Sequence, residues 1–440
     1  MLSQFMAENG KRIVLNFKDL ANDFKTDGKI QGVIFQIKDV TLPHKHFIFN
    51  FDLSGRLLTI ELGDQYRNRT IKLLERSFNG SIYIYLKNCN NLKDIDSPVN
   101  YYFDYYNEIV VHDNALAQHF IDYAQNLADN ILKNHHCIVS ANTVHDLTAS
   151  DILNDFVNQY DYAALTENKL FKKAYPKDIT VLPPDVRPDL NPAFGVLQIT
   201  NGCWVKHKHG PCAFCDAYSK VGYGELTVPE FISHIEAVKK YSGRDWRNKK
   251  YFFLSDGDPL KTQIPTVDYF RVIRDYIPQV QGIESFVTTA TILSKTPEEW
   301  AKLKEMGLTR LYWGVESADD FVLKFLHKPQ TNSSLYRAAN LLKKSDIAHT
   351  VIIMSGLGNF ETDNTCHNRH SEKTIEFVNN SCCDDVYVSK FKSIPGTLIH
   401  QKITEGILTN TKKTLPEDEH RNIISHLNKR VKGAYGTQFV

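Results

Sequence analysis

The sequence predicts an α/β chain in which a partial (β/α)6 barrel is preceded by an N-terminal α+β domain. Three observations lead to this prediction: strand patterns separated by turns before residue 180, alternating strand and helix patterns after residue 193, and a proline-rich stretch between them. The 440 residues, 42% of them hydrophobic, are enough to bury the cores of two domains.

The N-terminal domain, residues 1–182, is expected to hold an antiparallel sheet and a helix. Short alternating or apolar runs lie between turns rich in Gly, Asn and Asp, which is the pattern of antiparallel strands. Apolar residues then recur at helical spacing from Leu116 through Phe120 and Tyr123 to Leu127. The expected strands are 32–37, 47–51, 57–62 and 81–86. No pattern in this domain indicates its role.

A proline-rich linker, residues 183–192, is expected to separate the two domains. It contains Pro183, Pro184, Pro188 and Pro192. Proline neither extends a helix nor donates to the ladder of a central strand. We therefore place the domain boundary here.

Residues 193–400 alternate between strand and helix patterns, and residues 401–440 are expected to form a helical extension. Thr227 and Glu230 form a capping box that starts one helix, while a helix starting at Thr296 ends before Gly307. Six strands joined by helices predict a parallel sheet that is either curved into a partial barrel or doubly wound. In both architectures the active site lies at the carboxyl ends of the strands. The expected strands are 196–200, 250–254, 285–289, 310–314, 349–355 and 385–391.

Charge and cysteine content narrow the class of protein. With 52 basic and 51 acidic residues, the net charge of +1 gives no reason to expect a dedicated nucleic-acid binder. No run of eighteen apolar residues predicts a membrane span, and the first residues lack the layout of a signal peptide. Eight cysteines in such a chain favour reduced thiols and metal ligands over disulfides. A cytoplasmic enzyme is expected.

Three cysteines follow the first barrel strand. Cys203, Cys212 and Cys215 have the spacing Cys-x8-Cys-x2-Cys. Three thiolates can bind three irons of a cubane and leave the fourth iron open. A structural zinc site needs a fourth ligand, which His207 or His209 could supply. The spacing alone leaves both metals open, although a loop leaving the first strand of an α/β barrel is the place for a catalytic cofactor.

This cysteine loop resembles that of the radical S-adenosylmethionine (SAM) superfamily. The usual signature is Cys-x3-Cys-x2-Cys with an aromatic residue before the last cysteine, a position that Phe214 occupies here. The first gap is five residues longer, as in some branches such as the Elongator catalytic subunit. The resemblance implies that Cys203, Cys212 and Cys215 hold a [4Fe–4S] cluster and that SAM is bound beside it. The insert is expected on the surface, or in contact with substrate or an electron donor.

Two further motifs resemble SAM-binding segments of this superfamily. Asp256-Gly257-Asp258-Pro259 is similar to the Gly-Gly-Glu-Pro motif after the second strand, which implies contacts with the methionine ammonium group. Glu316 and Lys328 stand where the coproporphyrinogen dehydrogenase, methylthiotransferase and Elongator-like branches place Gln or Glu and a later Arg near SAM. Lysine keeps the charge of Arg but loses its bidentate fork. Pairing of Glu316 with Lys328 is the structural alternative.

The last matching segments lie on the third, fifth and sixth strands. Residues 288–291, among them Thr289, stand on the third strand where relatives often contact the SAM ribose. Gly356 belongs to a segment similar to the one that packs near adenine, with Phe214 on the other side. Residues 395–397, Pro-Gly-Thr, match an ending of the same branches. The resemblance covers residues 193–400 and leaves the subfamily open.

The expected function is reductive cleavage of SAM to a 5′-deoxyadenosyl radical, which abstracts hydrogen from an unidentified substrate. A one-electron donor such as flavodoxin or ferredoxin is the expected partner. Three alternatives stay open: an RNA-modifying enzyme, transfer of a 3-amino-3-carboxypropyl group, and a zinc-stabilised binding protein. The remaining candidates for a metal site, expected to be ordinary loop and core residues, are Cys366, His367, His370, Cys382 and Cys383.

Overall fold

The structure of the chain is a computed structural model. From residue 191 on it describes all residues except 219–220, 358–364, 392, 406–415 and 433–440. Before residue 191 it describes residues 2–6, 12–19, 33–42, 45–64, 69–76, 82–87, 108–111, 114–134, 143–144, 147–158, 169–176, 179, 182–183 and 186.

The chain divides into two compact units, and the domain boundary expected at residues 183–192 stays a prediction. The first consists of Met1–Asp178, Arg187–Gly195 and Ala237–Lys250, and the second of Ile179–Val186, Val196–Glu236 and Tyr251–Val440. Each unit is described by itself below.

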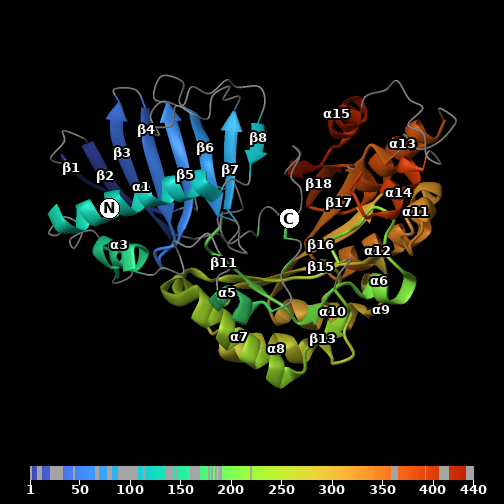
Figure 1. Cartoon of the computed structure of the whole chain (residues 1–440). Helices are drawn as coiled ribbons and strands as arrows, with labels where there is room; N and C mark the ends of the chain where they lie inside the picture. Colours follow the sequence, from blue (N-terminus) through green and yellow to red (C-terminus); the bar gives the residue numbers. More distant parts are fainter. Residues whose placement is uncertain are drawn as a thin grey trace. The chain divides into compact units, whose positions relative to one another are not determined.

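The first unit is built on an eight-stranded sheet in which each described strand pairs with its neighbours in sequence order (Figure 1). All of these pairings are antiparallel. The predicted strands correspond to β3, β4, β5 and β7, whereas the other four carry weaker patterns and were not predicted. The strands are β1 (Leu2–Met6), β2 (Arg12–Asp19), β3 (Val33–Leu42), β4 (Lys45–Phe51), β5 (Leu57–Asp64), β6 (Arg69–Arg76), β7 (Ile82–Lys87) and β8 (Glu108–Val111).

One face of this sheet packs on helices. Alternate residues of β3 and β4, such as Phe35, Ile37 and Phe49, form a core with the apolar stripe of α1 (Asn114–Asn134). Tyr123 on α1 donates a hydrogen bond of 2.7 Å to Asp39 Oδ2 on β3. The remaining elements before residue 180 are β9 (Thr143–Val144), β10 (Leu147–Thr148), α3 (Ala149–Asn158) and α5 (Lys169–Ala174).

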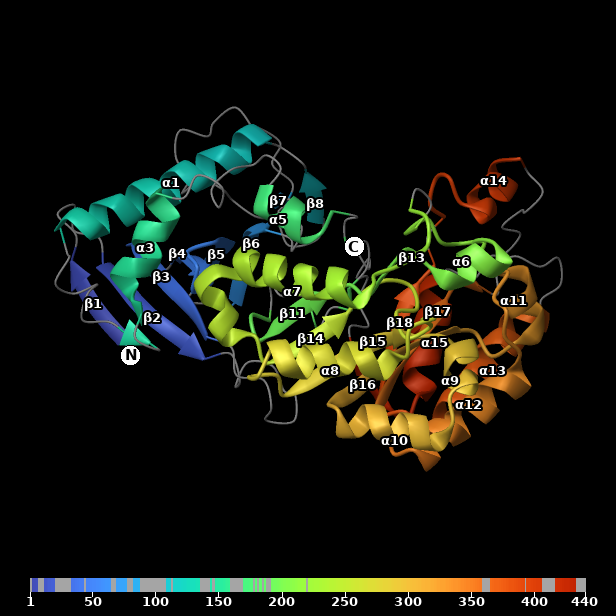
Figure 2. The same cartoon turned by 90° about the horizontal axis from the view of Figure 1, so that it is seen from below.

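The sheet of the second unit is parallel and has seven strands, in the order β11-β14-β15-β16-β17-β18-β19 (Figure 2). Six of them are the predicted barrel strands, so the α/β fold with a partial barrel is confirmed. The seventh, β19, lies in the part of the chain expected to be a helical extension. The strands are β11 (Phe194–Leu197), β14 (Tyr251–Leu254), β15 (Gly282–Val287), β16 (Leu308–Glu316), β17 (His349–Ser355), β18 (Asp385–Lys390) and β19 (Arg430–Lys432).

Local sequence signals explain where several helices of the second unit begin. Thr296 and Glu299 form a reciprocal capping box for α10, and Thr227 with Glu230 does the same for α7. Asp319 caps α11 through hydrogen bonds from the first turn. The helices after residue 200 are α6 (Trp204–His209), α7 (Val228–Ser242), the 3-10 helix η4 (Gly243–Asn248), α8 (Thr266–Tyr276), α9 (Thr289–Ser294), α10 (Pro297–Glu305), α11 (Asp320–Phe325), α12 (Asn332–Lys344), α13 (Thr365–Asn380), α14 (Leu398–Thr404) and α15 (Pro416–His426). A short ribbon pairs β12 (Thr200–Asn201) with β13 (Gly224–Glu225).

The third barrel strand ends earlier than predicted. The sequence predicted a strand over 285–289, but β15 ends at Val287 and Thr288 is the N-cap of α9. The hydroxyl of Thr288 accepts a hydrogen bond from the Thr291 N–H, which starts the helix there. β-Branched residues favoured the strand prediction, and capping chemistry outweighs that preference.

Parallel pairing brings the carboxyl ends of β14–β18 to one edge of the sheet. In β16 the pairing shifts between Gly314 and Glu316, and Glu316 has a φ of +61°. A residue other than glycine rarely adopts this left-handed conformation, so the bulge places the Glu316 side chain specifically.

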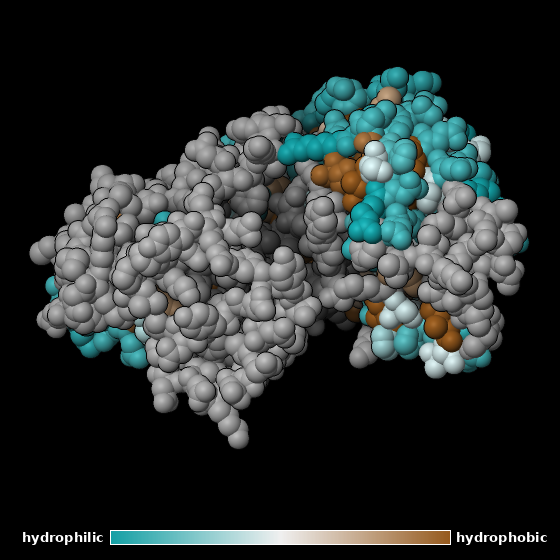
Figure 3. Space-filling model, turned by 90° about the horizontal axis from the view of Figure 1, so that it is seen from above, coloured by the Kyte–Doolittle hydropathy of each residue, from teal (hydrophilic) through white to brown (hydrophobic). Residues whose placement is uncertain are grey.

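The described surface has few large apolar side chains. On the face seen in Figure 3 most of the described residues are hydrophilic, with small apolar groups among them. Tyr276 and Phe321 are the large hydrophobic residues exposed among the described ones. Within the same residues, no helix combines the length and the apolar character needed to cross a bilayer.

Candidate active site

A cavity with a volume of about 670 Å³ lies at the carboxyl ends of the parallel strands. This volume is in the range of sites for small molecules and cofactors. The wall is made by the loop after β11, by the ends of β15, β16, β17 and β18, and by the residues that lead into α14. The predicted site residues on the wall are Cys203, Cys212, Phe214, Cys215, Gly257, Thr289, Glu316 and Lys328.

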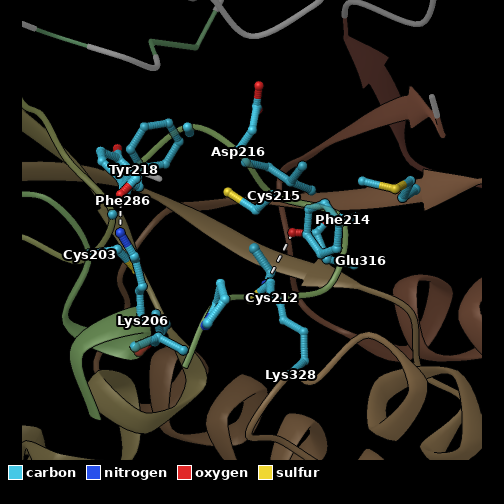
Figure 4. A pocket seen from close by; sticks show the side chains of 18 of the residues that line it. Cys203, Lys206, Cys212, Phe214, Cys215, Asp216, Tyr218, Phe286, Glu316 and Lys328 are labelled. Carbon is cyan, nitrogen blue, oxygen red and sulfur yellow. Dashed lines mark hydrogen bonds and ion pairs between the residues drawn. The ribbon is translucent and has the colours of Figure 1, made fainter. Parts of the chain in front are cut away.

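The three cysteines surround a common hollow (Figure 4). Cys203 is the N-cap of α6, so the insert that lengthens the first gap forms a short helix. Cys212 and Cys215 lie in the loop after it, where the Cys215 N–H donates to the Cys212 carbonyl at 3.1 Å. Val205 and Lys206 of the insert also line the cavity, while residues 207–209 are exposed.

Backbone hydrogen bonds hold the cysteine loop on both sides. The Ala213 N–H donates to the carbonyl of Leu326 at 2.9 Å, and the Ala213 carbonyl accepts from the Ile399 N–H at 2.9 Å. Ala213 also packs in an apolar cluster with residues of α11 and α14. This anchoring fixes the backbone between Cys212 and Cys215, although neither cysteine side chain takes part in it.

Asp256 and Gly257 support the other end of the loop. The Asp256 carboxylate accepts a hydrogen bond of 3.1 Å from the Gly202 N–H, and the Gly257 N–H donates to the Gly202 carbonyl at 3.1 Å. A Cβ atom on Gly257 would lie 2.7 Å from Cys203 Cβ and 2.8 Å from its Sγ. Glycine is therefore required for Cys203 to pack here. The Asp256 side chain faces Gly202 and does not line the cavity.

Burial raises the pKa of all three thiols, and raises the pKa of Cys215 to about 12. The positive charge of Lys328 acts in the opposite direction on each of them. Since the thiolate is the form that binds metal, loading of a metal group at this site releases protons. Without a metal these side chains are neutral thiols at pH 7.

The arrangement does not form a closed site for a single zinc ion. Three thiolates on one zinc lie about 3.8 Å apart, because each Zn–S bond is about 2.3 Å. Among the described residues, no group of three or more His, Cys, Asp and Glu side chains could hold one metal ion. His207 stacks on Tyr223 at 5.5 Å, and His209 contacts the Trp204 ring at 5.7 Å. In a cubane each thiolate binds a different iron, which suits cysteines placed around a hollow.

Glu316 and Lys328 form an ion pair on the cavity wall (Figure 4). Lys328 Nζ lies 3.1 Å from Glu316 Oε1 and donates to the Gly314 carbonyl at 2.9 Å. A Cβ atom on Gly314 would lie 3.2 Å from both charged atoms, so glycine leaves room for the pair. Burial lowers the pKa of Lys328, but Glu316 and Cys212 outweigh it and the pKa is raised. The structural pairing is present, and a SAM contact by either residue stays a prediction.

Asp258 lies behind the wall. It is 1% exposed, and its Oδ2 accepts hydrogen bonds from the hydroxyls of Thr291 at 2.6 Å and Thr288 at 2.7 Å. Burial raises the pKa of Asp258, and these two hydrogen bonds oppose that rise. The carboxyl group does not line the cavity, although the neighbouring Gly257 does. A direct contact of Asp258 with an ammonium group stays a prediction.

Thr289 lines the cavity from the first turn of α9, which corrects its predicted place on the third strand. Its hydroxyl donates to Gln330 Oε1 at 2.7 Å and accepts from Trp313 Nε1 at 3.0 Å. A hydroxyl has one proton and two lone pairs, so one acceptor position is left for a ligand. Gly356 has a φ of +87° and does not line the wall, whereas Ile352 and Met354 of the same strand do.

Lys206 and Gln330 are among the polar residues of the wall that were not predicted as site residues. Lys206 on α6 donates to the carbonyls of Tyr218 and Val221, the latter at 3.5 Å, and so closes the loop that follows the cysteines. Gln330 links Thr289 to the Val315 carbonyl, to which it donates at 2.8 Å. Neither belongs to a motif, and each acts through contacts between distant segments.

Within the described part of the chain, the other candidates for a metal site form no metal-binding group. His370 is buried, Cys383 is buried, and Cys382 is exposed. The side chains of Cys366 and His367 lie outside the described residues.

A parallel sheet with three cysteines on a cavity at its carboxyl edge is the arrangement expected of an α/β barrel with a cofactor site. Residues 197–367 match the family model described as the radical SAM superfamily, and the chain contains a radical SAM domain. The resemblance to this superfamily is confirmed, and the subfamily is not resolved.

Some solved structures are similar to part of this chain, at low identity and with low TM-scores. The radical SAM methyltransferase TsrM from Kitasatospora setae is 14% identical, with a TM-score of 0.38, over 48% of this chain and 39% of that chain. Methylornithine synthase, PylB, is 13% identical with a TM-score of 0.38, over 69% and 78%. Elp3 from the archaeon Methanocaldococcus infernus is 12% identical with a TM-score of 0.36, over 56% and 57%. The chain thus spans less than half of TsrM. No curated protein matches the chain in sequence.

Proposed function

We propose that Cys203, Cys212 and Cys215 hold a [4Fe–4S] cluster and that SAM binds in the adjoining cavity. The observation that carries the proposal is the placement of the three cysteines on one cavity at the carboxyl edge of the barrel. When bound, the reduced cluster supplies one electron to the sulfonium of SAM, which yields methionine and a 5′-deoxyadenosyl radical that takes a hydrogen atom from the substrate.

The chain contributes orientation and exclusion of water. Gly257 presents backbone to the cavity beside Cys203, where it can meet the amino group of SAM. Phe214 and Met354 give an apolar wall suited to the adenine ring. The Glu316–Lys328 pair provides both charges next to Cys212, suited to the charged methionine end.

The proposal also needs a one-electron donor. A flavodoxin or ferredoxin is the donor we propose, because the cluster must be reduced before each cleavage. RNA is not favoured as a substrate, since the net charge of +1 provides no excess of positive charge for a phosphate backbone. The substrate of the hydrogen abstraction is unidentified.

Anaerobic reconstitution tests the proposal. The wild-type chain, reconstituted with iron and sulfide and reduced with dithionite, is expected to bind four irons and convert SAM to 5′-deoxyadenosine. Cys212→Ala is expected to lose the cluster and all cleavage, because three thiolates are needed to leave one iron open. Cys382→Ala, which removes an exposed cysteine outside the cavity, is the matched control and is expected to behave as wild type. Formation of 5′-deoxyadenosine by Cys212→Ala at the wild-type rate would refute the assignment.

The same experiment separates the alternatives. Release of 5′-methylthioadenosine from SAM indicates transfer of a 3-amino-3-carboxypropyl group. A colourless protein that contains zinc after anaerobic purification indicates the zinc-stabilised binding protein. Copurifying tRNA that dissociates steeply with salt indicates an RNA-modifying enzyme.

A further inference from the structure

A buried polar cluster lies behind the β17 side of the cavity. Its members are Glu419 and His420 on α15, His370 on α13, Ser355 at the end of β17, and Ser317 after β16. Glu419, His370 and His420 are 1%, 0% and 2% exposed. Burying three ionisable side chains costs free energy unless each is hydrogen-bonded, so such a cluster needs an explanation.

Glu419 holds the backbone where β17 ends. Its Oε1 accepts a hydrogen bond of 2.8 Å from the Gly356 N–H. Gly356 has a φ of +87°, so the chain turns sharply there. The next residue on α15, His420, lies with its Nδ1 2.8 Å from Ser355 Oγ. Glu419 and His420 of α15 are therefore hydrogen-bonded to Gly356 and Ser355 at the end of β17.

His370 connects Glu419 to residues of the cavity wall. Its Nε2 lies 3.1 Å from the Met354 carbonyl and 3.5 Å from Glu419 Oε1. A carbonyl oxygen only accepts, so Nε2 carries the proton in this geometry. On the other side of the ring, Nδ1 lies 2.8 Å from Ser317 Oγ. Ser317 follows Glu316, and both Glu316 and Met354 line the cavity.

We propose that Glu419 is a positioning residue for SAM binding, which it supports by fixing the end of β17 through the Gly356 N–H and His370. The inference rests on the proposed function of the cavity. Glu419 is buried and does not line the cavity. It acts on Met354, which does, through the Gly356 backbone and through His370. It lies on α15, outside residues 197–367, the segment that matches the superfamily model.

Variants of Glu419 in the full-length, anaerobically reconstituted chain test the inference. Glu419→Asp keeps the charge but is one methylene shorter and cannot reach the Gly356 N–H, whereas Glu419→Gln keeps the reach and an acceptor oxygen. We expect Glu419→Asp and Glu419→Ala to raise the Kd for SAM about fivefold, the effect of losing one hydrogen bond. Glu419→Gln is expected to stay near wild type. Iron content is expected to be unchanged in all three.

The matched control is Asp418→Ala, which removes an exposed carboxylate from the same helix. SAM binding is measured by equilibrium dialysis, iron by colorimetry, and KM and kcat by 5′-deoxyadenosine formation. A merely structural role predicts loss of iron and kcat together, whereas positioning raises KM and leaves kcat near wild type. If Glu419→Ala does not fold, the comparison of Asp with Gln decides.

Two results overturn the inference. One is a Glu419→Asp variant that binds SAM as tightly as wild type, and the other is an equal effect of Asp418→Ala. A wild-type chain that carries the cluster and binds no SAM refutes the proposed function as well. A wild-type chain that binds SAM, together with an unaffected Glu419→Asp variant, refutes the positioning role alone.

Discussion

At the scale of single residues, Gly257 decides how closely the second strand end approaches Cys203. A Cβ atom at this position would meet two Cys203 atoms at less than 3 Å. Glycine at this position is thus explained by contact, independently of any ligand, and its φ is not in the left-handed region. The position of the Cys203 side chain, a candidate iron ligand, therefore depends on the absence of a side chain at residue 257.

Gly257→Ala is predicted to displace Cys203 and to lower the iron content of the reconstituted chain. Overpacking of this kind costs about 1–3 kcal/mol. Urea unfolding and iron per chain measure the two effects. Gly222→Ala is the control, because a Cβ there meets no atom within 4 Å. An iron content equal to that of the control would contradict the prediction, because it would show that the cysteine loop accommodates the added methyl group and still binds iron.

Asp256 gives the chain a stability that depends on pH. Burial raises the pKa of Asp256 to about 7, with hydrogen bonds from Gly202 and Gln198 acting against the rise. An unfolded Asp has a pKa of about 3.9, so the folded state holds the proton more tightly. The contribution of Asp256 to the free energy of unfolding is fully present below about pH 4. As the pH rises towards 7, the free energy of unfolding falls by about 4 kcal/mol.

Asp256→Asn is predicted to remove this fall in the free energy of unfolding between pH 4 and 7. An Asn amide stays neutral, and its oxygen can still accept from the Gly202 N–H. The variant is expected to be more stable than wild type at pH 8 and to show a flatter dependence between pH 4 and 7. Urea unfolding across this range measures it, with Asp418→Asn as an exposed control. Equal slopes in wild type and Asp256→Asn would contradict the prediction.

At the scale of elements, the barrel was largely predictable and its exceptions have physical causes. Buried parallel strands read as apolar runs, and capping residues such as Thr227 and Thr296 set the helix starts locally. β19 has three residues and depends on pairing with β18, a long-range contact that no local pattern encodes. The early end of β15 was missed because Thr288 suits a strand and a cap equally.

The candidate site was predictable where it rests on motifs and not where it rests on tertiary contacts. The three cysteines, Gly257, and the Glu316–Lys328 pair come together on one wall as their spacing and strand positions indicated. Asp258 accepts hydrogen bonds from two threonines behind the wall, and its expected contact with a ligand stays a prediction. Glu419 belongs to no motif, and it contacts the end of β17 only because the distant helix α15 folds against that strand.

At the scale of the whole molecule, each compact unit is formed by segments that are separated in the sequence. Residues Ala237–Lys250, which include the end of α7, belong to the first unit although their neighbours in sequence belong to the second. Tyr241 packs against Phe171 at 5.5 Å and Tyr175 at 6.2 Å. The Ser54 hydroxyl donates to the Ser242 carbonyl at 2.6 Å. A segment between two barrel strands thus completes the core of the N-terminal sheet unit.

Removal of residues 1–182 is therefore predicted to destabilise the remaining chain rather than release an independent domain. Tyr241, 4% exposed in the intact chain, would lose its aromatic partners, and exposing such a side chain costs about 1.5–3 kcal/mol. In a chain of this size each lost kcal/mol lowers the Tm by about 2–4 °C.

Thermal unfolding and sedimentation of residues 183–440 against the full chain measure this effect. Tyr241→Ser in the truncated chain is expected to reduce aggregation, since it removes the exposed ring. A truncated chain that stays monomeric and unfolds cooperatively at the full-chain temperature would instead support two separable domains joined at residues 183–192. The arrangement of Ala237–Lys250 argues for the first outcome, because its aromatic contacts with Phe171 and Tyr175 and its hydrogen bond from Ser54 would all be lost on truncation.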